Sequence, residues 1–174
     1  QPKAVLADTS LLASLPAREL RAGYAEVVKY GLLGDVRFFT WLEQNSAAIL
    51  ALEQDALMHA ILTSCKAKAR IVEADEREAG KRALLNLGHT FAHAFEAEAG
   101  YDGSVLHGEA VAVGMGLAFD LSVDLGICAS DDAARCKAHL HAVGLPSKQA
   151  DLAVGNVASG RLIDHMKHDK KMCN

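Results

Sequence analysis

The sequence predicts an all-α protein that forms a single domain over residues 1–174. Hydrophobic residues make up 51% of the chain and aromatic residues only 5%, and Ala and Leu, which favour helix, supply much of the apolar content. The residues that favour strands, such as Val, Ile and Thr, are scattered instead of grouped in alternating runs. A chain of 174 residues is also long enough to bury a hydrophobic core.

The N-terminal segment, residues 1–15, is expected to be extended and to lead into a first helix over Ala17–Leu33. Pro16 suits the first turn of a helix, where its missing N–H costs nothing, and the Ser14 hydroxyl is a candidate cap. Apolar side chains recur on one face of this helix, as a core-facing helix requires. They are Leu20, Tyr24, Val27, Val28 and Leu32.

The middle of the chain is expected to hold two further helices, a short helical stretch and a turn. Asp35–Gln44 has a helical pattern, and Asn45-Ser46 precedes another short helical stretch. The longest helical pattern covers Glu53–Asp75. Glu76–Gly80 follows as a charged turn.

Four helices are expected in the second half of the chain. Ala83–Ala99 is predicted to be one continuous helix that ends at Gly100. The most apolar segment, His107–Leu125, carries few charges and is predicted to be the central helix. Two shorter helical patterns complete the chain, Ser130–Gly144 and Gly160–His168.

Charge and cysteine usage exclude several classes of partner. The formal net charge is −4 and the pI is about 6.1, so no basic field attracts nucleic acid. No apolar run reaches the roughly 18 residues that a membrane-spanning helix needs, so no membrane partner is expected. The four cysteines form no CxxC pair, and they are interpreted as the reduced thiols of a cytoplasmic protein.

Polar residues suited to metal binding and proton transfer gather on one predicted helix. His89 and His93 are four residues apart, so a helix places both on one face. Asn86 and Arg82 lie three and seven residues before His89, close to the same stripe. A pair of histidines at this spacing is equally typical of capped or solvent-facing side chains, so the pattern alone leaves both interpretations open.

His107 and Glu26 extend this pattern to two other helices. His107 stands at the predicted start of an apolar helix, where the positive helix N-terminus is expected to keep its imidazole neutral, as a metal ligand must be. Glu26 has Lys29 one turn later, so it is either part of an ordinary helix ion pair or a ligand in a cleft. Two histidines and one carboxylate from three helices are the usual layout of catalytic zinc, with one position left open.

Basic side chains could bind an anionic metabolite if the fold brings them together. Arg presents a planar fork and Lys a point charge, and both suit phosphate or carboxylate groups. Taken one at a time, each of these residues is more typical of a solvated surface. The candidates are Lys29, Lys68, Arg82 and Lys170.

Four motifs, spread over the whole chain, together resemble one known family. They are Leu15–Leu20 with Gly23–Gly31, Glu73–Glu78 with Asn86–Ala94, Leu106–Met115, and Met166–Lys171. On these motifs the sequence resembles the C-terminal domain of the 3-dehydroquinate synthases, which belong to the sugar-phosphate cyclase superfamily. No GxGxxG motif follows a predicted strand, so the N-terminal Rossmann-like domain of that family is expected to be absent.

The resemblance implies roles for the residues singled out above. Glu26, His89 and His107 would bind one divalent metal ion, Zn²⁺ or Co²⁺. The N-terminal residues Leu11, Leu12, Ala13 and Ser14 would reach NAD, which is bound mainly by the missing N-terminal domain. The residues that would contact the substrate are His93, Lys29, Lys68, Arg82, Asn86 and Lys170.

The resemblance also implies the reaction. Family members convert the anionic sugar phosphate 3-deoxy-D-arabino-heptulosonate 7-phosphate into 3-dehydroquinate and phosphate, a step of the shikimate pathway to aromatic amino acids. NAD transiently oxidises a ring hydroxyl, phosphate leaves, NADH reduces the ketone, and the opened ring closes by aldol addition. The family is typically homodimeric. The chain is expected to be a fragment of a two-domain enzyme and to have no synthase activity by itself.

Three alternatives remain open from the sequence. A related sugar-phosphate cyclase could use the same metal and cofactor on a hexose or heptulose phosphate. An all-helical metal phosphohydrolase could use His168-Asp169, with His59 and Asp75 as further ligands. A helical interaction module without activity could use every histidine for packing or at the surface.

Overall fold

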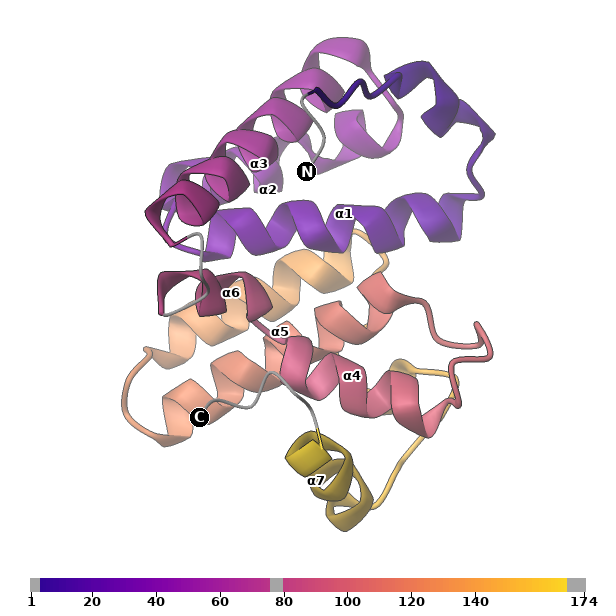
Figure 1. The fold of residues 1–174 in the computed structure, drawn as a ribbon, viewed down its shortest axis with the longest axis vertical. Coiled ribbons are helices and arrows are strands. Elements are labelled where there is room, and N and C mark those ends of the chain that lie inside the picture. Colours follow the sequence, from indigo (N-terminus) through magenta and orange to yellow (C-terminus); the bar gives the residue numbers. More distant parts are fainter. Residues whose placement is uncertain (1–3, 76–79, 169–174) are drawn as a thin grey trace.

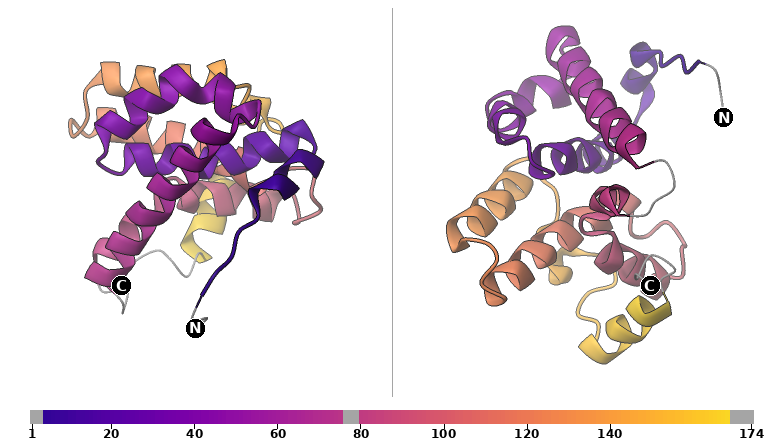
Figure 2. Two further views of the ribbon diagram at one scale, coloured as in Figure 1. Left: turned by 90° about the horizontal axis from the view of Figure 1, so that it is seen from above. Right: turned by 60° about the vertical axis from the view of Figure 1, so that its left-hand side comes forward.

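The computed structural model describes residues 4–75 and 80–168, and this part of the chain is helical without a strand. The predicted all-α class is therefore confirmed. The helices form two layers, one from the first half of the chain and one from the second half (Figure 1). The right view of Figure 2 shows the same division.

The first layer contains one 3₁₀ helix and three α-helices. They are η1 (Thr9–Ser14), α1 (Ala17–Leu32), α2 (Val36–Leu50) and α3 (Gln54–Ala74). α2 packs on α1, and α3 packs on both. The left view of Figure 2 shows α3 running diagonally across this layer.

The second layer contains four α-helices and two short 3₁₀ helices. They are η2 (Lys81–Asn86), α4 (His89–Glu98), α5 (His107–Asp124), α6 (Ser130–Ala142), η3 (Gln149–Asp151) and α7 (Ser159–His168). α5 packs against α4 and α6, and α7 packs against α4. α1 lies on α5, so this pair of helices joins the two layers (Figure 1).

α5 is the central helix, as predicted. Every residue from Ala110 to Gly116 is buried, and none of the side chains of Val111, Val113 and Met115 is exposed to solvent. Phe95 of α4 is also fully enclosed. Because each buried apolar side chain contributes roughly 1.5–3 kcal/mol, the packing of α5 against its neighbours is a major source of stability in the domain.

Two close backbone contacts set the distances between α5 and its neighbours. A Cβ atom at Gly108 of α5 would lie 1.9 Å from the carbonyl oxygen of Ala22 in α1. A Cβ atom at Gly114 would lie 2.1 Å from the carbonyl oxygen of Gly88, the residue before α4. Only glycine fits at either point, because the backbone of α5 lies directly against the backbone of α1 and of the residue before α4.

Part of the N-terminal segment, Thr9–Ser14, differs from the extended chain that the sequence predicts for residues 1–15. These residues form a 3₁₀ helix, and the Leu12 side chain packs against the hydrophobic core. This packing favours the helical turn over an extended chain. The predicted cap of α1 is also wrong, because the Ser14 hydroxyl donates to the Leu11 carbonyl at 2.7 Å. α1 begins after Pro16 without a side-chain cap.

α2 is one continuous helix and not the two shorter ones that the sequence predicts. The Asn45 amide donates to the Trp41 carbonyl at 2.8 Å, so this polar side chain is accommodated on the preceding turn instead of ending the helix. Asp35 lies before the helix and caps it, since its carboxylate accepts a hydrogen bond from the Phe38 N–H at 2.9 Å.

The predicted continuous helix over Ala83–Ala99 is wrong in its first part. Lys81–Asn86 is a 3₁₀ helix, and the chain then turns at Gly88, whose φ is +77°, before α4 begins at His89. Gly88 is buried against α5, where a Cβ atom would lie 2.6 Å from the Met115 nitrogen. The contact of Gly88 with α5 therefore determines where the 3₁₀ helix ends and α4 begins.

The other helices, α1, α3, α5, α6 and α7, begin and end within two residues of the predicted bounds. Of the predicted charged turn, residues 76–79 lie outside the part of the chain that is described. No described helix combines the length and the apolar character needed to cross a membrane.

Gly108→Ala should destabilise the protein, because the added methyl group would overlap the Ala22 carbonyl and push α1 away from α5. Overpacking of this kind costs roughly 1–3 kcal/mol, which urea unfolding would measure. Gly23→Ala in α1 is the matched control, because a Cβ atom there meets nothing within 4 Å. Since Ala favours helix over Gly by about 1 kcal/mol, this control should be more stable than wild type. A similar loss in both variants would contradict the steric explanation.

A buried pair, Tyr24 and His139, should make stability fall in acid. The Tyr24 hydroxyl and His139 Nε2 are 3.0 Å apart, and burial lowers the pKa of His139. The folded state therefore resists a proton that the unfolded state accepts near pH 6.5. The free energy of unfolding should decrease as the pH falls below this value. In His139→Gln the free energy of unfolding should fall less in acid than in wild type. The control His141→Gln, at an exposed position, should behave as wild type does.

Candidate metal centre

Three side chains from three helices converge where α1, α4 and α5 meet. The Glu26 Oε1 atom of α1 lies 3.6 Å from Nε2 of His89, the first residue of α4. It lies 3.7 Å from Nε2 of His107, the first residue of α5. One ligand atom from each residue lies within 4.8 Å of the other two, a spacing that one metal ion can bridge. We call these three residues the Glu–His–His cluster.

Both histidines are held through the ring nitrogen that faces away from Glu26. The Nδ1 atom of His89 lies 3.2 Å from the Leu87 carbonyl oxygen. The Nδ1 atom of His107 lies 3.0 Å from Oε1 of Glu96. Each Nδ1 has an acceptor, so it carries the proton, and in the neutral ring the lone pair of Nε2 points toward Glu26. This is the usual arrangement of metal-binding histidines, in which an outer partner orients each ring.

The Glu26 carboxylate is half-buried and ionised. Burial raises its pKa, but the His107 imidazole and the Lys29 ammonium group outweigh burial and bring the pKa down to about 2. Oε2 pairs with the Lys29 Nζ at 2.6 Å. Oε1 is buried and has no hydrogen-bond partner. A negative oxygen without a hydrogen bond, together with the two imidazole nitrogens that it faces, provides the donor set that a divalent cation requires.

The two histidines differ in their affinity for protons. Burial lowers the pKa of His89, whereas the carboxylates of Glu26 and Glu96 raise the pKa of His107 to about 9. The expectation that the helix N-terminus keeps His107 neutral is therefore wrong, because two nearby carboxylates outweigh the partial charge of a helix end. A metal ion at Nε2 of His107 would have to displace a proton from that nitrogen.

The start of α5 is tied to α1 by a second set of contacts. The guanidinium group of Arg18 donates to both carboxylate oxygens of Glu109, each at 2.7 Å, and to the Ser104 carbonyl at 2.7 Å. Glu109 also accepts a hydrogen bond from the Leu106 N–H at 3.0 Å. Such a paired fork fixes orientation as well as distance, so the residues around His107 are held in register with α1.

Some of the predicted substrate contacts lie beside the cluster. Lys29 is almost fully buried and pairs with Glu26. The ring centroid of His93 lies 5.7 Å from that of His89 and 6.5 Å from that of His107. Arg82 and Asn86 lie on η2, the 3₁₀ helix just before α4, and both are half-buried.

The described structure shows no contact between the cluster and the other predicted site residues that it includes. Lys68 is exposed on α3, and no contact joins it to the cluster within the described chain. Lys170 lies outside the described residues, two positions beyond the end of α7 at His168. The predicted NAD segment, Leu11–Ser14, lies on η1, where Leu11 is 67% exposed.

Two residues that support this centre were not predicted from the sequence: Glu96 contacts His107, and Arg18 holds the start of α5 through Glu109. Glu96 lies seven positions after His89 and three after His93, so helical spacing alone places it on the same face of α4. That spacing could have identified it. Arg18 could not have been found in this way, because its partner Glu109 is 91 positions away in the sequence.

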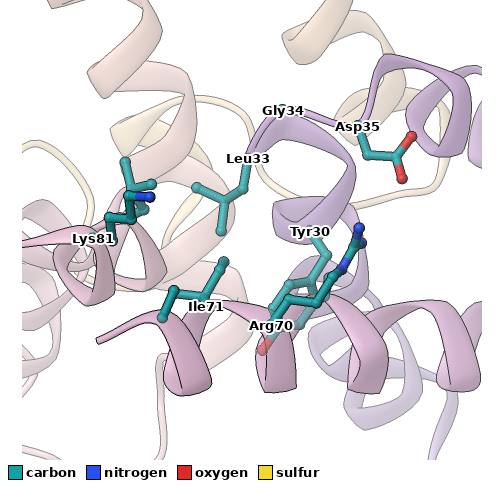
Figure 3. Close-up of a pocket in the computed structure, with 10 residues that line it drawn as sticks. Tyr30, Leu33, Gly34, Asp35, Arg70, Ile71 and Lys81 are labelled. Carbon is teal, nitrogen blue, oxygen red and sulfur yellow. The ribbon is translucent and has the colours of Figure 1, made fainter. Parts of the chain in front are cut away.

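A cavity of about 320 Å³ lies next to this region, between the ends of α1 and α3 and the 3₁₀ helix η2. Figure 3 shows Leu33 and Ile71 pointing toward each other across it, with Lys81 on one side and Arg70 on the other. None of the three cluster residues lines this cavity. The candidate metal centre is therefore a separate feature.

The phosphohydrolase alternative gains no support. Within residues 4–75 and 80–168, the Glu–His–His cluster is the one group of three or more potential metal ligands, and it excludes His59, Asp75 and His168. His59 packs against the Trp41 ring, with centroids 4.3 Å apart. His59 is exposed, so it is a surface residue that packs on this ring.

Two solved structures share this fold. The 2-epi-5-epi-valiolone synthase of Streptomyces hygroscopicus, with NAD⁺ and Zn²⁺ bound, matches 92% of this chain and 43% of its own, with a TM-score of 0.80 and 25% identity. A 2-deoxy-scyllo-inosose synthase complexed with carbaglucose-6-phosphate, NAD⁺ and Co²⁺ matches 94% of this chain and 43% of its own, with a TM-score of 0.77 and 28% identity. The fold is that of the helical domain of sugar-phosphate cyclases.

Within that class, residues 23–172 match the family model described as 3-dehydroquinate synthase C-terminal, and the chain belongs to this family. The 3-dehydroquinate synthase of Rhodospirillum rubrum is 57% identical over 99% of this chain. That of Caulobacter vibrioides is 55% identical over 98% of it. The chain spans less than half the length of these relatives, 45% and 46% respectively.

Zn²⁺ should bind to the 174-residue chain at the Glu–His–His cluster. His89→Ala or His107→Ala removes a ligand, so each should weaken binding by more than the roughly 10–100-fold that is typical of changes to outer partners. Competition with a chromophoric chelator measures this affinity, and His141→Ala, on the exposed surface of α6, is the control. Equal affinities in wild type and both variants would exclude the cluster as a metal site.

Proposed function

We propose that residues 1–174 are the metal- and substrate-binding helical domain of a 3-dehydroquinate synthase. The complete enzyme would convert 3-deoxy-D-arabino-heptulosonate 7-phosphate into 3-dehydroquinate and phosphate. The observation that carries this proposal is the Glu–His–His cluster, in which the ionised Glu26 carboxylate faces two imidazoles. The Nδ1 atom of each imidazole contacts an acceptor on the other side of its ring. Relatives named 3-dehydroquinate synthase, 50–57% identical to the chain, support the choice of reaction.

Glu26, His89 and His107 fit a divalent metal ion, Zn²⁺ or Co²⁺. The fit rests on the buried Oε1 atom of Glu26, which lacks a hydrogen-bond partner in the present arrangement. When bound, such an ion would hold substrate hydroxyls and polarise an oxygen that develops negative charge. Three protein ligands leave at least one coordination position open for the substrate.

The residues next to the cluster would bind and orient the substrate. Lys29 helps His107 keep Glu26 ionised and brings a buried positive charge to the site. His93 lies beside both histidines of the cluster and would move a proton to or from a substrate hydroxyl. Arg82 and Asn86 on η2, with Lys68 and Lys170, would complete a set of groups that bind an anion.

NAD would supply the transient oxidation and re-reduction that make the enzyme a phosphate-eliminating lyase. We infer that most of its binding site lies in the rest of the enzyme and that Leu11–Ser14 reaches it from this chain. The exposure of Leu11 on η1 is consistent with such a contact. The two solved cyclases were determined with NAD⁺, which supports a cofactor shared across the class. A homodimer of the full-length enzyme remains a prediction from the family resemblance.

A cyclase that acts on another sugar phosphate is the closest alternative. The two solved cyclases with such names are 25% and 28% identical to this chain. The 3-dehydroquinate synthase of Rhodospirillum rubrum is 57% identical over 173 residues. The difference in identity favours the 3-dehydroquinate synthase reaction.

A chimaera would test the activity. The chain would replace the matching 45% of the Rhodospirillum rubrum relative, and phosphate release would be followed with NAD and Zn²⁺ present. We expect turnover of 3-deoxy-D-arabino-heptulosonate 7-phosphate by the chimaera and none by the 174-residue chain alone. His93→Ala in the chimaera should lower kcat by roughly 10²–10⁴-fold, as is typical when general acid–base catalysis is lost.

The choice between substrates is tested on the same chimaera. Turnover of a hexose phosphate in place of the heptulosonate would favour the alternative cyclase. A chimaera that binds Zn²⁺ and NAD but turns over neither substrate would contradict the proposed reaction.

A further inference from the structure

Glu96 lies behind the most exposed of the three cluster residues. Its carboxylate Oε1 is 3.0 Å from Nδ1 of His107, on the side of the ring opposite Glu26. The Glu96 side chain is only 15% exposed, whereas that of His107 is 48% exposed. The contact therefore joins a well-enclosed carboxylate to an imidazole that has solvent over about half of its surface.

We propose that Glu96 is a positioning residue for metal binding, which holds the His107 ring with Nε2 directed at the metal. This inference rests on the proposed metal centre and extends it to a residue outside the ligand set. Glu96 would fix the proton of His107 on Nδ1 and restrict rotation of the ring. An imidazole held by a carboxylate in this way is also a more basic metal ligand.

The place of His107 in the fold explains why it needs such a residue. His107 is the first residue of α5 and follows the loop that joins α4 to α5. The contacts of Arg18 and Glu109 hold the backbone of this region, but none of them touches the imidazole. The hydrogen-bond acceptor that the described structure gives the ring is Glu96, because Glu26 Oε1, 3.7 Å from Nε2, is beyond hydrogen-bond distance.

His89 is oriented in a different way. Its Nδ1 faces the Leu87 carbonyl two residues earlier, so a backbone acceptor in the turn before α4 orients this ring. Its side chain is only 9% exposed, and packing restricts it further. The two histidines should therefore respond differently to substitutions, because a side-chain change can remove the outer partner of His107 but not that of His89.

α4 thus contributes to the centre twice. It supplies His89 as a candidate ligand and, seven residues later on the same face, Glu96 as the partner of the other histidine. The backbone contact of Gly88 with Gly114 sets how α4 lies on α5, and so sets the distance that Glu96 must span to reach His107.

Three variants of the 174-residue chain would test the inference. Glu96→Ala removes the acceptor, and Glu96→Gln keeps an oxygen that can accept from Nδ1 but removes the charge. Glu98→Ala is the matched control, because Glu98 is a carboxylate on the same helix with 11% exposure. It pairs with Arg161 at 2.8 Å and His165 at 3.2 Å of α7, away from His107.

The measurements are Zn²⁺ affinity, the visible absorption spectrum of the Co²⁺-loaded chain, and the unfolding of the metal-free chain. We expect Glu96→Ala to lose roughly 10–100-fold in Zn²⁺ affinity and to change the Co²⁺ spectrum. Glu96→Gln should recover part of the affinity, and Glu98→Ala should bind Zn²⁺ as wild type does. A purely structural role would lower the stability of the metal-free chain without changing the Co²⁺ spectrum.

The result that would overturn the inference is wild-type affinity and an unchanged Co²⁺ spectrum in Glu96→Ala. If that variant does not fold, ¹⁵N spectra of His107 in the metal-free Glu96→Gln chain decide, recorded at a pH above the His107 pKa so that the ring is neutral, since a ring not held by residue 96 would populate both neutral tautomers. A wild-type chain that binds neither Zn²⁺ nor Co²⁺ would instead contradict the metal centre itself. The two failures can therefore be told apart.

Discussion

The close approach of α5 to α1 and α4 is the constraint on which the rest of the structure depends. Gly108 lies against the Ala22 carbonyl, and Gly114 lies against the Gly88 carbonyl. A side chain at either glycine would push one neighbouring helix away from α5. These contacts bring the start of α5, the start of α4 and the middle of α1 to one point, where Glu26, His89 and His107 meet.

The charges at this point are balanced in pairs. Lys29 neutralises one oxygen of Glu26, Glu96 faces His107, and Arg18 pairs with Glu109 just beyond. One buried carboxylate oxygen, Oε1 of Glu26, has no hydrogen-bond partner and faces the imidazoles of His89 and His107 at 3.6 and 3.7 Å. Burying a charged oxygen is costly unless a positive charge lies near it, and either a proton on His107 or a metal ion bound at the cluster supplies that charge. The packing of α1, α4 and α5 brings these groups together.

Much of the fold and part of the site could be predicted from local sequence patterns. The spacing of His89 and His93 placed both on one helix face, and the run of apolar residues after His107 identified the central helix. The break at Gly88 could not be predicted in this way, because it depends on contact with α5. The raised pKa of His107 was missed for the same reason, since Glu26 and Glu96 come from other helices.

The sequence by itself determined the all-helical class, the approximate bounds of most helices and the residues able to bind a metal ion, because helical periodicity and side-chain chemistry are local properties. Only the tertiary structure decided that Glu26, His89 and His107 lie within reach of one ion, and that Glu96 lies behind His107. Those distances depend on how closely α1, α4 and α5 approach one another. That approach is set by backbone contacts between residues far apart in the sequence.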